Sequence, residues 1–88
     1  MSEELDVRRR RAAWRAAHRG TKEMDVLLGR YAVDALPAME DAALARFEQF
    51  LALPDPDLQK WLLNPDGSAQ TDFADLVTQV RAFHGLSS

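Results

Sequence analysis

The stretch Gly20–Ala35, GTKEMDVLLGRYAVDA, carries the clearest fold signal in the sequence. Its apolar side chains recur at i, i+3, i+4, i+7, i+8 and i+11, which is the spacing of one face of an α-helix. The residues of this stripe are Met24, Leu27, Leu28, Tyr31, Ala32 and Ala35. Thr21 precedes the stripe and suits an N-cap, because its hydroxyl can accept a hydrogen bond from a first-turn amide. We therefore predict an amphipathic helix that buries the stripe.

The preceding segment, residues 3–18, is predicted to form another helix. Acidic residues begin it and basic residues end it, in the order that the helix dipole favours. These charged residues are Glu3, Glu4 and Asp6 at the start and Arg15, His18 and Arg19 at the end. Ala13, Ala16 and Ala17 form with Gly20 a smooth face that lets another helix approach closely. Gly20 also suits the position just past a helix end, where a left-handed backbone is common.

Three further segments carry helix signals. The one after Pro37 has the apolar side Met39, Ala43, Phe47, Phe50 and Leu51. In the next, Asp55 suits an N-cap, Pro56 the first helical position, and Leu58, Trp61 and Leu62 the inner face. A turn at residues 64–67 leads to residues 71–84, which would bury Phe73, Leu76, Val77, Val80 and Phe83 and end at Gly85. The prediction is an all-α fold, a small antiparallel bundle of five short helices in one domain over residues 1–88.

Composition limits the possible functions. The chain has 88 residues, a net charge of -3 and no cysteine, which excludes disulfides, thiolate catalysis and cysteine-ligated metals. Residues 1–23 carry seven Arg and Lys against four Asp and Glu, whereas residues 24–88 carry four against ten. A basic start on an acidic body fits a protein partner better than nucleic acid. No apolar run is long enough to span a membrane and no signal-peptide core is seen, so we expect a cytoplasmic protein.

Catalytic chemistry finds little support. The histidines, His18 and His84, each lie at a predicted helix end, where a solvent-facing side chain is the ordinary interpretation. The glycines at 20, 29, 67 and 85 cannot form a phosphate-binding loop of the GxGxxG or P-loop type. We therefore expect no catalytic residue and no metal site.

Two groups of side chains could instead contact a partner. One group begins in the arginine run of residues 8–11. Helical spacing places Arg8 and Arg11 of this run on one face with Arg15. That face is either a solvated surface or a patch for an acidic partner. Trp61 shares the register of Leu58 and Leu62 and is expected to be buried or half-buried in the core. Trp14 fits the small-residue face poorly, so it is expected at an edge, where aromatic residues either pack or anchor partners.

The turn itself has two interpretations. In the first interpretation, ordinary helix chemistry accounts for each residue separately: Gly20 ends a helix, Thr21 caps the next, and Glu23 is an anion in its first turn. However, Arg19-Gly20-Thr21-Lys22-Glu23 also resembles the RGxxE signature of the small FAD assembly factors of succinate dehydrogenase. A second stretch, Asp55-Pro56-Asp57-Leu58 with Trp61-Leu62 and Asn64, is similar to that family's DPDLxxWL(M/L)N element. The resemblance covers about residues 8–84.

The resemblance implies a function and a surface. Members of this family promote covalent attachment of FAD to a histidine of the succinate dehydrogenase flavoprotein, and some also serve fumarate reductase. It implies that Arg19, Gly20 and Glu23 bind the flavoprotein, with Asp25 as a neighbour. His18 stands where some relatives have a second arginine, which puts the strength of the basic contact in doubt.

The resemblance also implies a monomeric, chaperone-like binding protein rather than an enzyme. Attachment needs a nucleophilic histidine and an oriented flavin, and both belong to the client. We expect no FAD to be held stably by the chain itself, and the sequence leaves direct FAD binding open. The alternative is a helical module that binds nucleic acid or regulates through the Arg8–Arg11 helix, which the acidic body disfavours.

Overall fold

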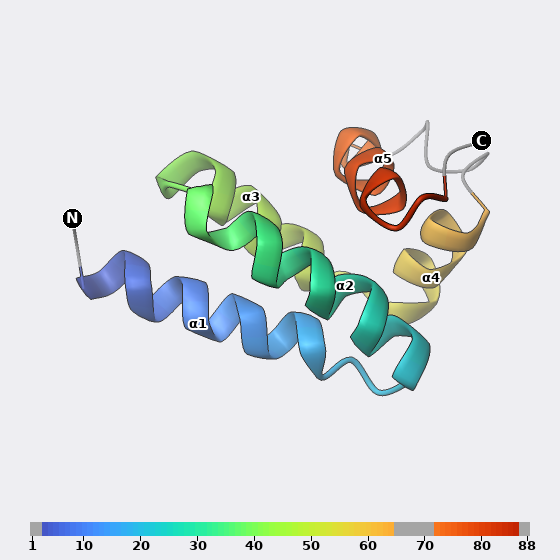
Figure 1. Cartoon of the computed structure of the whole chain (residues 1–88), viewed down its shortest axis with the longest axis horizontal. Helices are drawn as coiled ribbons and strands as arrows, with labels where there is room; N and C mark the ends of the chain where they lie inside the picture. The colour runs from blue at the N-terminus through green and yellow to red at the C-terminus, as the bar shows by residue number, and fades with distance from the viewer. Residues whose placement is uncertain (1–2, 65–71, 87–88) are drawn as a thin grey trace. The chain divides into compact units, whose positions relative to one another are not determined.

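The computed structural model describes residues 3–64 and 72–86 of the chain (Figure 1). Over these residues the chain forms α-helices, one short 3-10 helix and no strand, which confirms the all-α prediction with its five α-helices. The elements are α1 (Glu3–Ala17), α2 (Lys22–Ala35), η1 (Leu36–Ala38), α3 (Asp41–Leu51), α4 (Asp55–Leu63) and α5 (Ala74–Phe83). They fall into two compact units, Met1–Ala52 and Leu53–Ser88. The single domain over residues 1–88 stays a prediction.

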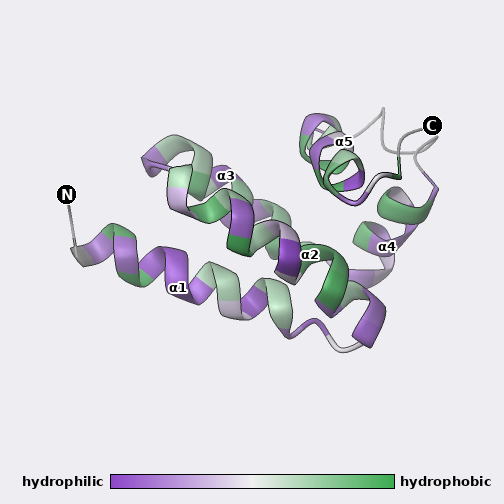
Figure 2. Ribbon diagram, viewed as in Figure 1, coloured by the Kyte–Doolittle hydropathy of each residue, from purple (hydrophilic) through white to green (hydrophobic). Residues whose placement is uncertain are grey.

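In the first unit, α1 and α2 lie antiparallel and in close contact (Figure 1). A Cβ atom placed on Gly29 of α2 would lie 3.1 Å from Ala17 Cα, so the helix backbones approach where neither residue has a large side chain. The predicted close approach at the small residues of α1 is therefore confirmed for Ala16 and Ala17. Ala12, which was not predicted, is also buried, whereas Gly20 is exposed and lies beyond the helix. Figure 2 shows the small apolar residues of α1 toward its C-terminal half, after a largely hydrophilic start.

The stripe predicted on α2 forms the centre of the first unit. Met24, Leu27, Leu28, Tyr31 and Ala32 are buried, and Ala35 is half-buried. Thr21 caps the helix as predicted, because its Oγ1 accepts a 3.3 Å hydrogen bond from the Met24 amide. At the other end Pro37, which has no amide hydrogen to donate, lies in η1 directly after α2.

α3 completes the first unit through its aromatic side chains. The Phe47 ring lies 5.9 Å from the Tyr31 ring and 6.3 Å from the Phe50 ring, centroid to centroid. The expected apolar side was right for Met39, Phe47, Phe50 and Leu51 but wrong for Ala43, which is exposed. Leu44 is fully buried instead.

The second unit contains α4 and α5. Leu58 and Leu62 of α4 and Leu76, Val77 and Val80 of α5 are buried. Arg81 of α5 donates a hydrogen bond from Nη1 to the Leu62 carbonyl at the end of α4. This bond joins the two helices of the unit at a carbonyl near a helix C-terminus, where a cation is favoured.

Several predictions in the second unit need correction. The N-cap of α4 is Pro54, and Asp55 is its first helical residue. Phe73, which was expected to be buried, is half-buried, and Phe83 is 43% exposed. Trp61 is half-buried, which agrees with its prediction. The predicted turn at residues 64–67 and the start at residue 71 lie largely outside the described residues.

The end of α5 follows the prediction closely. Gly85 has φ +72°, the left-handed conformation expected of the residue that ends a helix. The Leu86 amide bonds the Arg81 carbonyl at 2.8 Å and the Gly85 amide bonds the Ala82 carbonyl at 3.1 Å. These bonds satisfy carbonyls that the last turn of a helix leaves without partners.

Candidate functional site: the turn between α1 and α2

The turn between α1 and α2 is fixed by backbone conformation at its centre. Gly20 has φ +116°, a value that residues with a Cβ atom rarely adopt. Thr21 follows in an extended conformation, with φ -124° and ψ 147°, and its carbonyl accepts the Asp25 amide at 2.9 Å. The predicted role of Thr21 as a cap is confirmed. Gly20 has the predicted positive φ, but α1 already ends at Ala17, so Gly20 lies within the turn and not directly after the helix.

Arg19 fastens this turn to two other parts of the first unit. Its backbone amide donates to Asp25 Oδ1 in the first turn of α2. Its guanidinium Nη1 donates to the Leu51 carbonyl at 2.6 Å, at the C-terminus of α3. A cation is favoured there, because the last carbonyls of a helix carry the negative end of its dipole. Arg19 therefore ties together α1, α2 and α3.

The remaining motif residues face solvent. Gly20, Thr21, Lys22 and Glu23 are exposed, whereas Arg19 and Asp25 are half-buried. The predicted partner-binding residues of the turn thus fall into two groups. Arg19 and Asp25 are half-buried and bonded to each other, whereas Gly20 and Glu23 are exposed and accessible to a partner. Spacing in the sequence could not reveal this division, because the Leu51 carbonyl comes from a distant segment.

In the predicted group Arg8, Arg11 and Arg15, Arg8 is bonded to a residue of α3, and the role of the group in binding a partner stays a prediction. Arg8 forms a two-pronged bond with Glu48 of α3, Nη2 to Oε1 at 2.7 Å and Nε to Oε2 at 3.3 Å, and lies 3.6 Å from Asp41. The hydrogen bond from Arg8 lowers the pKa of the Glu48 carboxyl, and burial opposes this shift only in part. Arg11 and Arg15 are exposed.

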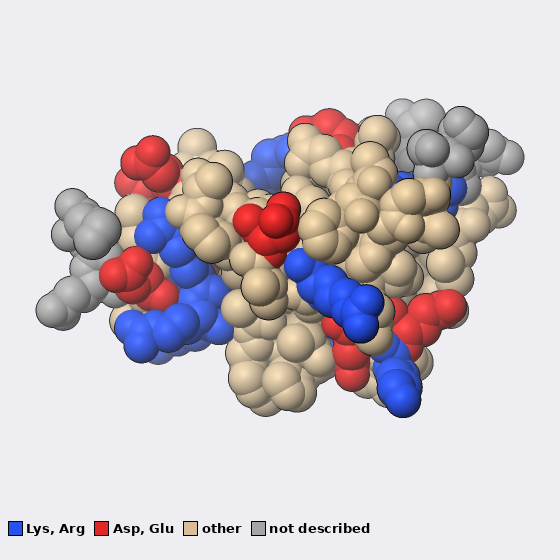
Figure 3. All heavy atoms as spheres, viewed as in Figure 1, with Lys and Arg blue, Asp and Glu red and all other residues tan. Residues whose placement is uncertain are grey.

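Arg9 also forms its hydrogen bonds within the first unit. It donates to the Met39 carbonyl from Nε at 3.0 Å and from Nη2 at 2.7 Å, and its Nη1 bonds Asp6 at 3.1 Å. Figure 3 accordingly shows basic and acidic side chains interleaved at the end of the first unit where α1 begins. The nucleic-acid alternative is therefore not favoured, since Arg8 and Arg9 already have intramolecular partners.

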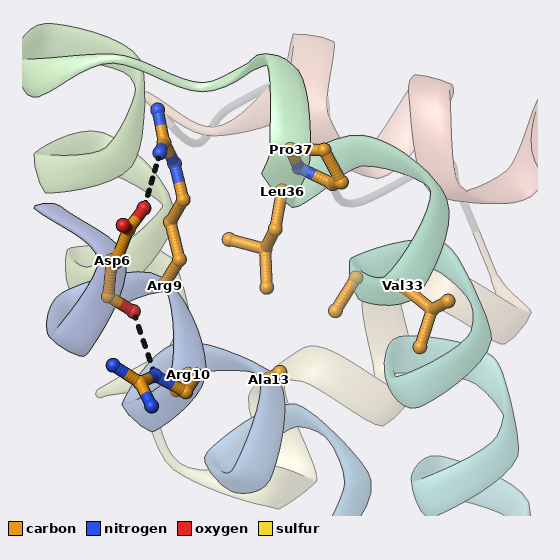
Figure 4. Close-up of a pocket in the computed structure, with 8 residues that line it drawn as sticks. Asp6, Arg9, Arg10, Ala13, Val33, Leu36 and Pro37 are labelled. Atoms are coloured by element: carbon orange, nitrogen blue, oxygen red, sulfur yellow. Dashed lines mark hydrogen bonds and ion pairs between the residues drawn. The ribbon is translucent and has the colours of Figure 1, made fainter. Parts of the chain in front are cut away.

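A pocket of about 530 Å³ lies in the first unit between α1 and the end of α2 (Figure 4). Its walls are the apolar residues Ala13, Ala32, Val33, Leu36 and Pro37, and its polar side is formed by Asp6, Arg9 and Arg10. Asp6 already accepts bonds from both arginines, from Arg9 at its carboxylate and from Arg10 at its carbonyl at 3.4 Å. The pocket thus offers a shallow apolar surface rather than an array of charges for a phosphate group.

His18 and Trp14 form a surface pair next to the turn. Their rings stack with centroids 4.3 Å apart and planes 15° apart, and both residues are exposed. The expected edge position of Trp14 is confirmed. The stack itself was missed, although i and i+4 spacing places two side chains on the same helix face.

The chemistry of the turn suits binding. Across residues 3–64 and 72–86 no three His, Asp or Glu side chains lie close enough to hold a metal ion. In the same ranges no helix is sufficiently long and apolar to cross a membrane. The turn and the first residues of α2 present a polar, solvent-facing surface with one cation, Lys22, and one anion, Glu23. These features define a small all-α protein with an exposed polar turn between its first two helices.

Comparisons with known proteins assign the chain to a family. Residues 10–84 match the model of the family described as the flavinator of succinate dehydrogenase (Sdh5), and the chain belongs to that family. It is 31% identical to the FAD assembly factor SdhE of Acinetobacter baylyi over 86 residues, 97% of this chain and 100% of that protein. It is 43% identical to the FAD assembly factor SdhE of Acetobacter pasteurianus over 58 residues, 66% of this chain and 53% of that protein. No solved structure matches the chain.

Proposed function

We propose that this chain is an assembly factor that binds the flavoprotein subunit of succinate dehydrogenase and promotes covalent attachment of FAD to its histidine. Family membership over residues 10–84 carries the proposal. The exposed residues 20–23 supply a surface for docking, and the hydrogen bonds of Arg19 to Asp25 and to the Leu51 carbonyl stabilise the turn that carries them.

The requirements of flavin attachment indicate which part of the process each protein provides. The reaction needs a nucleophile and a flavin ring held in the correct orientation, and an assembly factor has only to stabilise a client conformation that provides both. A preformed turn suits that role, because little conformational entropy is lost when a rigid surface binds. The chain then acts as a chaperone-like binding protein, and the chemistry remains in the client.

The proposal extends to the setting of the complex. The chain would act as a monomer in the cytoplasm, and the flavoprotein of fumarate reductase would be a second client. FAD would be held by the client, with no stable complex between FAD and the chain alone. Titration of free FAD with the purified chain, followed by flavin fluorescence, tests this last point: a saturable change at micromolar concentrations would contradict it.

The central experiment measures covalent flavin on the client. The flavoprotein is produced with and without this chain, denatured and separated by electrophoresis, and its flavin fluorescence is recorded. We expect strong fluorescence only when the chain is present, and co-purification of the two proteins. Equal fluorescence without the chain would refute the proposed function.

A matched pair of variants links this function to the turn. Glu23→Ala removes an exposed carboxylate from the motif, and Glu40→Ala removes an exposed carboxylate at the start of α3. Both changes should alter stability by less than about 1 kcal/mol, as surface substitutions usually do. We expect Glu23→Ala to reduce client flavinylation sharply and Glu40→Ala to leave it unchanged. Normal flavinylation by Glu23→Ala would show that the turn is not the docking surface.

A further inference from the structure

The Trp14–His18 pair is a surface feature that the motif does not explain. Trp14 is 62% exposed, more than Phe83 at 43%, and it lies on the outer side of α1. An indole ring so exposed contributes little to the core of the first unit, and large aromatic side chains are the commonest anchors of protein interfaces.

The Trp14 ring is held in place although it is exposed. It stacks on the His18 ring at 4.3 Å, and His18 Nδ1 lies 2.8 Å from the Trp14 carbonyl. Because a carbonyl can only accept, Nδ1 carries the proton and donates this bond. The bond fixes the orientation of the imidazole, and the stack restricts the indole. A side chain restricted in this way loses less entropy when a partner covers it.

The surroundings of the pair resemble the structure of an interface. Arg11 lies three residues before Trp14 and Arg15 three residues before His18, and both arginines are exposed. Helical spacing places Arg11 on the same side of α1 as Trp14, and Arg15 is the next residue after Trp14 in the helix. An apolar centre with a charged border is the usual arrangement of a docking site, in which the border excludes water from the anchor.

The pair is also continuous with the exposed turn. His18 is followed by Arg19, whose fixed position leads directly to the exposed residues 20–23. A partner surface that covers Glu23 can therefore extend along the last turns of α1. The surrounding arginines select a partner that is negatively charged at this place.

We propose that Trp14, held by His18, is the apolar anchor of client docking, and that it enters a socket on the flavoprotein bordered by carboxylates that face Arg11 and Arg15. This inference rests on the proposed function and deepens it. It assigns the specificity of docking to α1 as well as to the turn. A single-stranded nucleic acid could also stack on an exposed indole among arginines, and the test below includes it as an outcome.

The test is a binding titration of the full chain with client flavoprotein purified in the absence of any assembly factor. Trp14→Ala should weaken binding by at least about 30-fold, the loss expected for a dominant anchor. Trp14→Phe should recover most of the affinity, because a smaller ring still enters the socket. His18→Ala should weaken binding by about threefold to tenfold, because the indole is then less restricted. Val33→Ala is the control, since Val33 is 73% exposed on α2 and lies outside this surface.

The outcomes are distinguishable. Unchanged urea midpoints for all variants would show that the affinity losses concern binding and not folding. Wild-type affinity in Trp14→Ala, alongside weak binding in Glu23→Ala, would overturn this inference and leave the proposed function standing. Absence of client binding by the wild type would overturn both. Tighter binding of the chain to a single-stranded oligonucleotide than to the client, lost in Trp14→Ala, would also overturn the inference.

Discussion

Replacing Arg19 with alanine should destabilise the first unit by about 2 kcal/mol. The change removes the guanidinium that donates to the Leu51 carbonyl at 2.6 Å. A hydrogen bond that involves a charged group contributes about 1.5–3 kcal/mol, and the lower end applies because Arg19 is only half-buried. Loss of a cation from the C-terminal end of α3 adds about 0.5 kcal/mol.

Urea unfolding followed by far-ultraviolet circular dichroism measures this change. With a slope of about 1 kcal/mol per molar urea, typical of a small protein, the midpoint should fall by about 2 M. Arg19→Lys keeps the charge but not the planar fork, and should lose about half as much. Arg11→Ala is the matched control, because Arg11 is exposed, and it should stay within about 0.5 kcal/mol of wild type.

The same variants separate two roles of the motif. Arg19→Ala should lose both stability and client flavinylation, since the turn is no longer held against α3, whereas Glu23→Ala should lose flavinylation alone. An Arg19→Ala midpoint within about 0.3 M of wild type would refute the conclusion that this guanidinium fastens the turn.

Three further predictions concern other parts of the chain. Gly20→Ala should lower stability by about 1 kcal/mol or more, because φ +116° is strained for a residue with a Cβ atom, and a normal melting temperature would contradict this. Trp61→Ala should cost about 2 kcal/mol, roughly half of the cost for a fully buried aromatic, and an unchanged urea midpoint would place Trp61 outside the packing of its unit. Glu48 has a lowered pKa through its bond from Arg8, so it stabilises the fold above its ordinary pKa of 4.5 and loses this contribution as the pH falls through the lowered value. Glu48→Gln should therefore show a smaller loss of stability between pH 5 and about pH 2 in urea titrations, and an equal loss would refute that account.

The local features of the fold were predictable because they depend on neighbouring residues. The short-range geometry of the chain gives the stripe from Met24 to Ala32, the cap at Thr21, the positive φ of Gly20 and the helix stop at Gly85. The same rules gave the edge position of Trp14. Family resemblance then pointed to the motif of residues 19–23 as the proposed docking site, which helix chemistry alone would have explained as a turn.

The errors arose where distant segments decide the environment of a side chain. Helical spacing did not identify the partner of Arg8, because Glu48 lies on α3, forty residues away in sequence. Leu44 rather than Ala43 faces the core, because a one-residue difference turns a helix by about 100° and tertiary packing selects the rotation. Arg19 similarly bonds a carbonyl that no local pattern identifies.

The first unit contains side-chain interactions that join residues at very different separations along the chain. Arg19 and Asp25 are six residues apart, whereas Arg8 and Glu48 are forty apart. The entropic cost of closing a loop rises with its length, so the turn should form early in folding and the long-range ion pair late. Interactions that are absent from the folding transition state chiefly slow unfolding. We therefore expect loss of the Arg8–Glu48 pair to raise chiefly the unfolding rate of the unit, and changes in the turn to lower chiefly its folding rate.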